Sequence, residues 1–158
     1  MRYAVDAVTK RAGMRDVIVR YFEACNQGDS EAIARCLTPD AIHYFPPGMY
    51  GGAFRGARAI GDRWATAYQE LGSRWALDRV AVDAEMNTAV AEWSHYKTKQ
   101  GTVLRGDEWY EFDEDSGLIS EIRAYYASPQ AADLQRLELA AFDYAGRGYS
   151  HRPPRDDA

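Results

Sequence analysis

The spacing of apolar residues changes once along this chain, and this change constrains the fold more than any other feature. Apolar residues first recur at helical spacing, and after Gly72 they alternate with a period of two, which is typical of half-buried strands. The helical pattern covers three segments: Met14–Gln27, a short stretch around Ala32–Leu37, and Ala57–Leu71. Helices followed by a run of strands predict an α+β fold.

The strands expected from alternation are Asp40–Phe45, Arg74–Asp83, Thr88–Thr98, Thr102–Phe112 and Leu118–Ala127. Short links join the last four, and links of hairpin length predict an antiparallel meander. Three helices on one face of such a curved sheet would make a cone with an open mouth. Pro46–Gly56, which holds two prolines and four glycines, predicts an irregular ordered loop at that mouth.

The ends of the chain are interpreted separately from this domain. Residues 1–13 are expected to form an N-terminal segment, residues 14–145 the α+β domain, and residues 146–158 a mobile polar tail. Ser128 and Pro129 predict the start of an extra C-terminal helix. Its apolar side would carry Leu134, Leu137, Ala141 and Tyr144.

Composition excludes several functional classes. Nineteen Lys and Arg against 24 Asp and Glu give a net charge of -5, which argues against nucleic acid or an anionic membrane as partner. No run approaches the roughly 20 apolar residues of a membrane span, and no signal peptide is recognisable. Two cysteines, Cys25 and Cys36, suit a reducing cytoplasm. An aromatic content of 13% suits a lined pocket or an aromatic interface.

A provisional register places two polar residues on the core face. A two-residue turn at Gln100–Gly101 sets His95 opposite Gly106 and Trp93 opposite Glu108. A five-residue loop at 113–117 then sets Glu108 opposite Ile122 and Tyr110 opposite Ser120. His95 and Glu108 would be diagonal neighbours. An inward carboxylate is costly without compensation, so Glu108 needs a partner, a raised pKa or a wet cavity.

Several segments resemble the nuclear transport factor 2-like superfamily, most closely its SnoaL-like polyketide cyclase group. The matching segments are Tyr21–Asp29, Leu37–Ala41, Phe54–Gly56 and Gly117–Tyr125. The resemblance implies a cone-shaped α+β barrel that often dimerises. Members include isomerases, dehydratases, epoxide hydrolases, cyclases and binding proteins without chemistry, so the fold alone does not fix the function.

The resemblance also implies roles for individual residues. Tyr21 falls where ketosteroid isomerase has its oxyanion tyrosine, and Glu108 at or beside its protonated carboxylic acid. The general-base aspartate of that enzyme falls near Phe45, which cannot act as a base. The last-strand aspartate of the epoxide hydrolase falls near Ala124. The tyrosines and histidines of scytalone dehydratase have outline counterparts in Tyr21, His43 and His95.

Each catalytic candidate has a structural alternative. His95 is expected either as a proton shuttle or as a core histidine bonded to Glu108 or a tyrosine. Glu108 would orient it or act as a neutral acid. Tyr21 would donate to an oxyanion or simply fill the core. His43 would reach the cone mouth or end a strand in water. The expected substrate-binding residues are aromatic or aliphatic: Phe45, Tyr50, Trp64, Trp93, Tyr110, Ile122 and Tyr126.

These features favour a small enzyme that needs no cofactor and no metal and moves protons on an apolar or aromatic small molecule. The reaction would be an isomerisation, cyclisation, dehydration or hydration. A non-catalytic binding protein and a partner-binding domain are the alternatives. The outer face of the sheet carries Tyr96, Trp109 and Tyr125 among charges of both signs, including an expected Asp107–Arg123 pair. Such a face predicts a homodimer.

Overall fold

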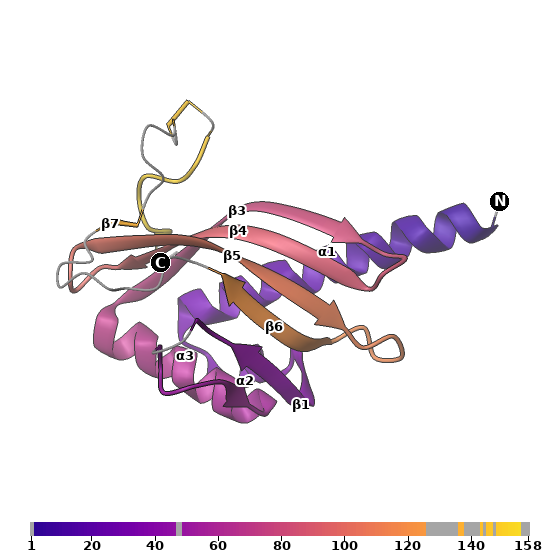
Figure 1. Cartoon of the computed structure of the whole chain (residues 1–158), viewed down its shortest axis with the longest axis horizontal. Coiled ribbons are helices and arrows are strands. Elements are labelled where there is room, and N and C mark those ends of the chain that lie inside the picture. The colour runs from indigo at the N-terminus through magenta and orange to yellow at the C-terminus, as the bar shows by residue number, and fades with distance from the viewer. Residues whose placement is uncertain are drawn as a thin grey trace.

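The computed structural model describes residues 2–46, 49–125, 136–137, 143, 145–146 and 148–155. Helices dominate the chain up to Leu71, apart from two strands between residues 37 and 55, and a run of strands follows from Ser73, as the change of period predicts (Figure 1). The helices are α1 (Arg2–Gln27), α2 (Ser30–Ala34) and α3 (Ala57–Leu71). The strands are β1 (Leu37–Tyr44), β2 (Phe54–Arg55), β3 (Ser73–Asp83), β4 (Thr88–Lys97), β5 (Thr102–Phe112), β6 (Ile119–Tyr125) and β7 (Arg136–Leu137). No helix within these described parts has the length and apolarity needed to cross a membrane.

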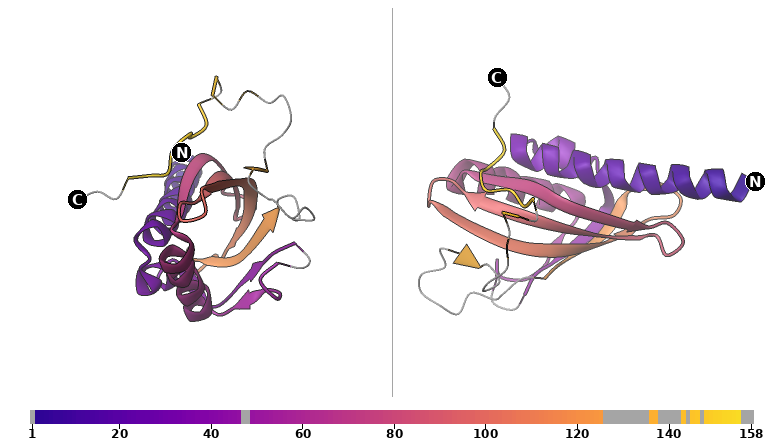
Figure 2. Two further views of the ribbon diagram at one scale, coloured as in Figure 1. Left: turned by 90° about the vertical axis from the view of Figure 1, so that its left-hand side faces the viewer. Right: turned by 90° about the horizontal axis from the view of Figure 1, so that it is seen from above.

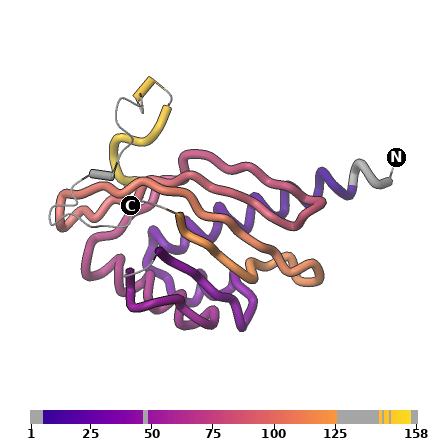
Figure 3. Tube along the Cα trace, viewed as in Figure 1, coloured from indigo at the N-terminus to yellow at the C-terminus, as the bar shows by residue number. Residues whose placement is uncertain are grey.

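The first helix is longer than its apolar stripe. It begins at Arg2, not at Met14 as predicted, and its first turns run past the end of the sheet (Figure 3). The residues before Gly13 are mostly good helix formers without a proline, so the helix continues where no core remains to contact. Gly28 ends the helix at a φ of +65°. A Cβ there would lie 2.7 Å from the Tyr68 ring, so both backbone conformation and space require glycine.

The sheet is mixed, which corrects the prediction of a wholly antiparallel one. Its order is β2-β1-β6-β5-β4-β3, and β3 to β6 form the predicted antiparallel meander. β1 instead pairs with β6 in parallel, and the unpredicted strand β2 returns from the 46–56 loop to pair with β1. The sheet curls around the helical layer, so its concave face meets α1 and α3 (Figure 2).

Both hairpin registers differ from the prediction by two residues. His95 stands opposite Leu104 and Glu108 opposite Ala91, because β4 ends at Lys97 and a four-residue turn follows. The Thr98 and Lys99 amides donate to the carbonyls of Gly72 and Leu71, which anchors this turn to the end of α3. Between β5 and β6, Tyr110 stands opposite Ile122 and not Ser120. A shift of two keeps every side chain on its predicted face.

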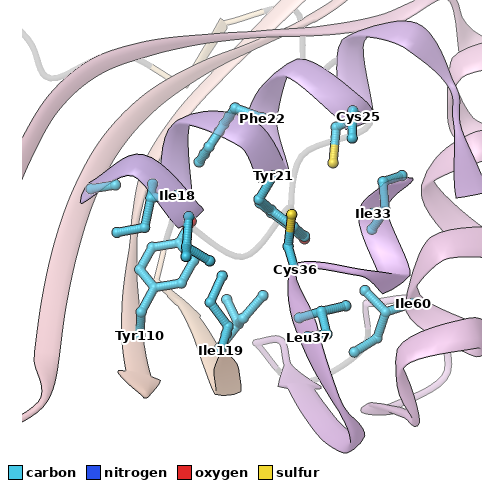
Figure 4. Packing of buried hydrophobic residues seen from close by; sticks show 14 of the residues in the cluster. Ile18, Tyr21, Phe22, Cys25, Ile33, Cys36, Leu37, Ile60, Tyr110 and Ile119 are labelled. Carbon is cyan, nitrogen blue, oxygen red and sulfur yellow. The ribbon is translucent and has the colours of Figure 1, made fainter. Parts of the chain in front are cut away.

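The core lies between the concave face and the helices. Figure 4 shows Ile18 of α1 beside Tyr110 of β5, and Cys25, further along the same helix, toward Cys36 and Ile33. Both cysteines are free thiols in this cluster. Burial raises the pKa of each thiol, so neither is poised as a nucleophile.

The C-terminal segment differs from the prediction. Residues 136–137, placed by the sequence in a helix, form strand β7 beside Val103 and Leu104, an edge of β5 that β6 leaves unpaired. The rest of the predicted helix, with Leu134, Ala141 and Tyr144, lies outside the described residues. The predicted mobile tail includes a docked segment: Ser150 accepts from the Tyr96 hydroxyl at 2.7 Å, and its amide donates to Asp78 at 3.0 Å.

Candidate functional site

A buried histidine and a buried carboxylate meet on the concave face. His43 on β1 has no solvent exposure, so it is not a strand-end histidine in water. Its Nε2 lies 3.3 Å from Oε1 of Glu108 on β5. The contact lacks hydrogen-bond geometry, and among the described residues neither ring nitrogen of His43 has a hydrogen-bond partner. A buried imidazole in this state keeps hydrogen-bonding capacity that a ligand can satisfy.

The local sequence explains how Glu108 reaches His43. Glu108 stands between two alanines in the sheet, Ala91 on β4 and Ala124 on β6. His43 pairs with Ile122, so the short side chain of Ala124 lies on the path of the carboxylate toward the imidazole. Glu108 therefore has the partner that an inward carboxylate requires, but that partner is His43 and not His95.

Two tyrosines complete the polar cluster. The Tyr110 hydroxyl donates to Oε2 of Glu108 at 2.6 Å, which fixes the other oxygen toward His43. Burial, reinforced by the negative charge of Glu108, raises the pKa of Tyr110 well above its ordinary value, so this donor keeps its proton. Tyr21 accepts from Nε1 of Trp64 at 2.8 Å, and its ring lies 6.5 Å from that of Tyr110. Burial raises the pKa of Tyr21 as well.

His95 lies apart from this cluster. Its Nε2 is 2.8 Å from the Ser73 hydroxyl, and its ring stacks on Trp75 with a centroid distance of 4.2 Å. Burial, together with the positive charge of Lys97, lowers the pKa of His95 to about 3. The predicted diagonal with Glu108 is wrong, because the two-residue shift moves His95 further from Glu108 along the sheet. His95 is therefore a neutral core histidine paired with a serine.

Four aromatic rings pack against one another beside His43, in a cluster that we call the aromatic box. Its members are Phe45, Tyr50, Phe54 and Trp64, with centroids 4.7–5.9 Å apart. His43 stacks on Phe45 at 4.2 Å and meets Trp64 edge-on at 5.5 Å. Phe45, Tyr50 and Phe54 are only partly buried, so the box reaches the surface. The Gly- and Pro-rich loop holds Tyr50 at a φ of +52°, strained for a bulky residue, and such strain gathers at ligand sites.

The expected substrate-binding residues divide into three groups. Phe45, Tyr50 and Trp64 are in the aromatic box, Tyr110 belongs to the polar cluster, and Ile122 stands opposite Tyr110. Trp93 is buried opposite Gly106, and Tyr126 lies outside the described residues. Phe54 is a box residue that the sequence pattern does not single out as a site residue, although it belongs to the Phe54–Gly56 segment. In the described parts of the chain, no three His, Cys, Asp or Glu side chains are grouped to hold a metal ion.

Comparison with known proteins assigns the family. The model of the SnoaL-like domain matches residues 18–122. The chain belongs to the SnoaL-like family. No curated protein matches the sequence. A solved protein of unknown function with a cystatin-like fold, from Methylobium petroleophilum PM1, is 56% identical. The match covers 94% of this chain and 97% of that one, with a TM-score of 0.74.

More distant structures share the fold. A proposed polyketide cyclase from Xanthomonas campestris pv. campestris is 22% identical over 75% of this chain and 93% of its own, with a TM-score of 0.57. SalBIII, an epoxide hydrolase/cyclase-like enzyme of pyran ring formation in salinomycin, is 15% identical. That match covers 72% and 90% of the two chains with a TM-score of 0.59. At these identities the similarity extends to the fold alone, which is the predicted α+β cone.

Proposed function

We propose that this protein is a cofactor-independent enzyme that moves a proton on a small apolar or aromatic molecule, in an isomerisation, cyclisation, dehydration or hydration. The observation that carries this proposal is the buried imidazole of His43, which makes no hydrogen bond within the described residues and lies beside the Glu108 carboxylate. Membership of the SnoaL-like family supports it, since cyclases occur among proteins of this fold.

In the proposed mechanism His43 is the general base or acid. It takes a proton from a C–H or O–H group of the substrate through the nitrogen that faces away from Glu108. The Glu108 carboxylate stabilises the imidazolium that forms, and the Tyr110 hydroxyl holds that carboxylate in place. His43 then returns the proton to another atom of the product, so no external reductant or oxidant is needed.

Tyr21 is the proposed donor to the oxygen on which negative charge develops. It keeps its proton because burial raises its pKa, and Trp64 fixes its oxygen from one side. The hydroxyl also hydrogen-bonds with the Cys25 thiol. Sulfur is a weak acceptor, so a substrate oxygen would compete well for this proton.

Turnover of a panel of phenols, ketones and lactones tests the proposal. We expect His43→Gln and Glu108→Gln each to lower kcat about 100-fold or more, within the usual range for a lost acid–base group. His95→Gln is the matched control, since it alters a buried histidine outside the cluster. Binding that raises the melting temperature without any turnover would instead favour a small-molecule binding protein.

We also propose that the protein is a cytoplasmic homodimer. Trp109 and Tyr125 are 42% and 53% exposed on the outer face of the sheet, which is unusual for such large rings. Arg123 stands between Tyr44 and Trp109 in the sheet register and pairs with Glu111 and Glu121. A second copy would cover these rings and match charges of both signs. The two free cysteines suit a reducing compartment.

A further inference from the structure

The aromatic box carries an arginine without an acidic partner. Arg63 on α3 is half-buried, and its guanidinium carbon lies 5.3 Å from the centroid of Tyr50 and 5.9 Å from that of Phe54. These ring contacts are its interactions within the described residues, where no carboxylate or carbonyl oxygen meets it. Arg58, one turn earlier on the same helix, lies instead near Asp62 at 3.9 Å.

The geometry of the arginine leaves its hydrogen-bonding edge available. A guanidinium over a ring uses its flat face and positive charge, whereas its N–H donors point outward in its own plane. Those donors form a fork that fits the two oxygens of a carboxylate. Because Tyr50 and Phe54 already position the group, little side-chain freedom remains to be lost when an anion binds.

The box connects this arginine to the proposed catalytic residue. Tyr50 and Phe54 contact Trp64 and Phe45, and these two rings contact His43. We propose that the substrate is an aromatic or apolar carboxylate: Arg63 binds its carboxylate, the exposed surface of the box packs against its apolar body, and the reacting end faces His43. Only the last part of this inference, that the reacting end faces His43, rests on the proposed function.

Electrostatics would fix the direction in which such a substrate binds. The other end of the cluster holds the buried Glu108 carboxylate, which disfavours a second negative charge nearby. The protein as a whole has a net charge of -5, so attraction of an anion must come from local groups. Arg63 supplies that attraction at the half-buried end of the box, and the charged group of the substrate stays away from Glu108.

Matched pairs of probes test this inference in the full-length protein. Cinnamate and phenylacetate are compared with cinnamamide and phenylacetamide, which keep the ring and lose the charge. We expect each carboxylate to bind at least about tenfold more tightly than its amide, as a charge-assisted pair allows. Arg63→Met keeps the aliphatic stem and should abolish the preference, whereas Arg63→Lys should keep part of it. Arg58→Met is the matched control: the Arg58 side chain is 86% exposed, and its replacement should leave the preference for carboxylates unchanged.

The readouts separate this inference from the proposed reaction. Equal binding of carboxylates and amides by the wild-type protein, or a preference that survives in folded Arg63→Met, would overturn the role of Arg63. His43→Gln is measured with the same probes and should keep the preference, because the anion binds elsewhere. If His43→Gln also keeps full turnover, the proposed reaction is wrong while the carboxylate site stands.

Discussion

His43 and Glu108 meet at 3.3 Å although a whole strand, β6, separates β1 from β5. The meeting depends on Ala124, the residue of β6 that stands opposite Glu108. A larger side chain at this position would occupy the path of the carboxylate. Ala91 stands opposite Glu108 on the other side, on β4, where it does not separate Glu108 from His43.

The first prediction compares valine at these two positions. Ala124→Val and Ala91→Val each add two methyl groups to a buried site, so we expect each to cost about 1–3 kcal/mol of unfolding free energy. Only Ala124→Val should also lower kcat, because it pushes the carboxylate away from His43. Chemical denaturation measures the unfolding free energy. Turnover of a substrate found in the panel of phenols, ketones and lactones measures kcat. Equal loss of kcat in both folded variants would mean that the path across β6 is irrelevant.

The second prediction concerns acid sensitivity. His95 is buried as a neutral imidazole with a pKa of about 3, whereas in the unfolded chain its pKa is near 6.5. Between these values the unfolded state binds more protons, so acid favours unfolding. Its contribution to stability is complete above about pH 6.5 and falls progressively toward pH 3, by roughly 4–5 kcal/mol in total.

His95→Gln removes this titration and preserves a hydrogen-bonding group near Ser73. The unfolding free energy of the variant, measured by urea titration at several pH values from 7 to 4, should depend less on pH than that of the wild type. His151, in the exposed tail, provides the matched control as His151→Gln. Parallel pH profiles for wild type and His95→Gln would show that His95 is not the acid-sensitive group.

The faces of the strands were predictable from sequence, but their partners were not. Alternation places His95, Glu108 and Tyr110 on the inner face whatever the register, because a slip of two residues preserves the face. The turn at 98–101 decides the actual partners, and it depends on contacts with the end of α3. The amino-acid sequence of the hairpin alone does not show that its turn contacts α3.

The central contact of the site was hidden for a different reason. His43 is on β1, which joins the sheet through a parallel pairing with β6, more than 70 residues later in the chain. The register of two strands this far apart in the chain is not set by a hairpin turn, so the contact between His43 and Glu108 could not be predicted from the sequence. Phe54 was overlooked because a two-residue strand inside a glycine-rich loop produces no period.

The third prediction concerns the docked tail. Tyr149 donates to Glu92 at 2.6 Å, and Ser150 bonds with Tyr96 and Asp78 on the outer face. A chain that ends at Gly148 loses these three bonds, and at about 0.5–1.5 kcal/mol each we expect a loss of about 1.5–4.5 kcal/mol in unfolding free energy. A chain that ends at Arg155 keeps them and serves as the control. Coincident urea transitions of the two chains would mean that docking contributes nothing.

The fourth prediction concerns the uncovered part of the outer face. The docked tail buries Tyr96, whereas Trp109 and Tyr125 remain exposed on β5 and β6. The proposed dimer therefore uses the half of the face near Trp109, not the whole face. A glutamate in the middle of that half would bring an unpaired charge into the interface, which disfavours association.

Light scattering at micromolar concentration measures the outcome. We expect the wild type to have the mass of a dimer and Trp109→Glu that of a monomer, with little change in unfolding free energy per chain, because Trp109 is outside the core. Met86→Glu is the matched control: Met86 is 69% exposed in the β3–β4 turn, away from Trp109 along the strands, and its replacement should leave the dimer intact. A monomeric wild type, or a dimer that persists in Trp109→Glu, would show that this face is solvated in the native protein.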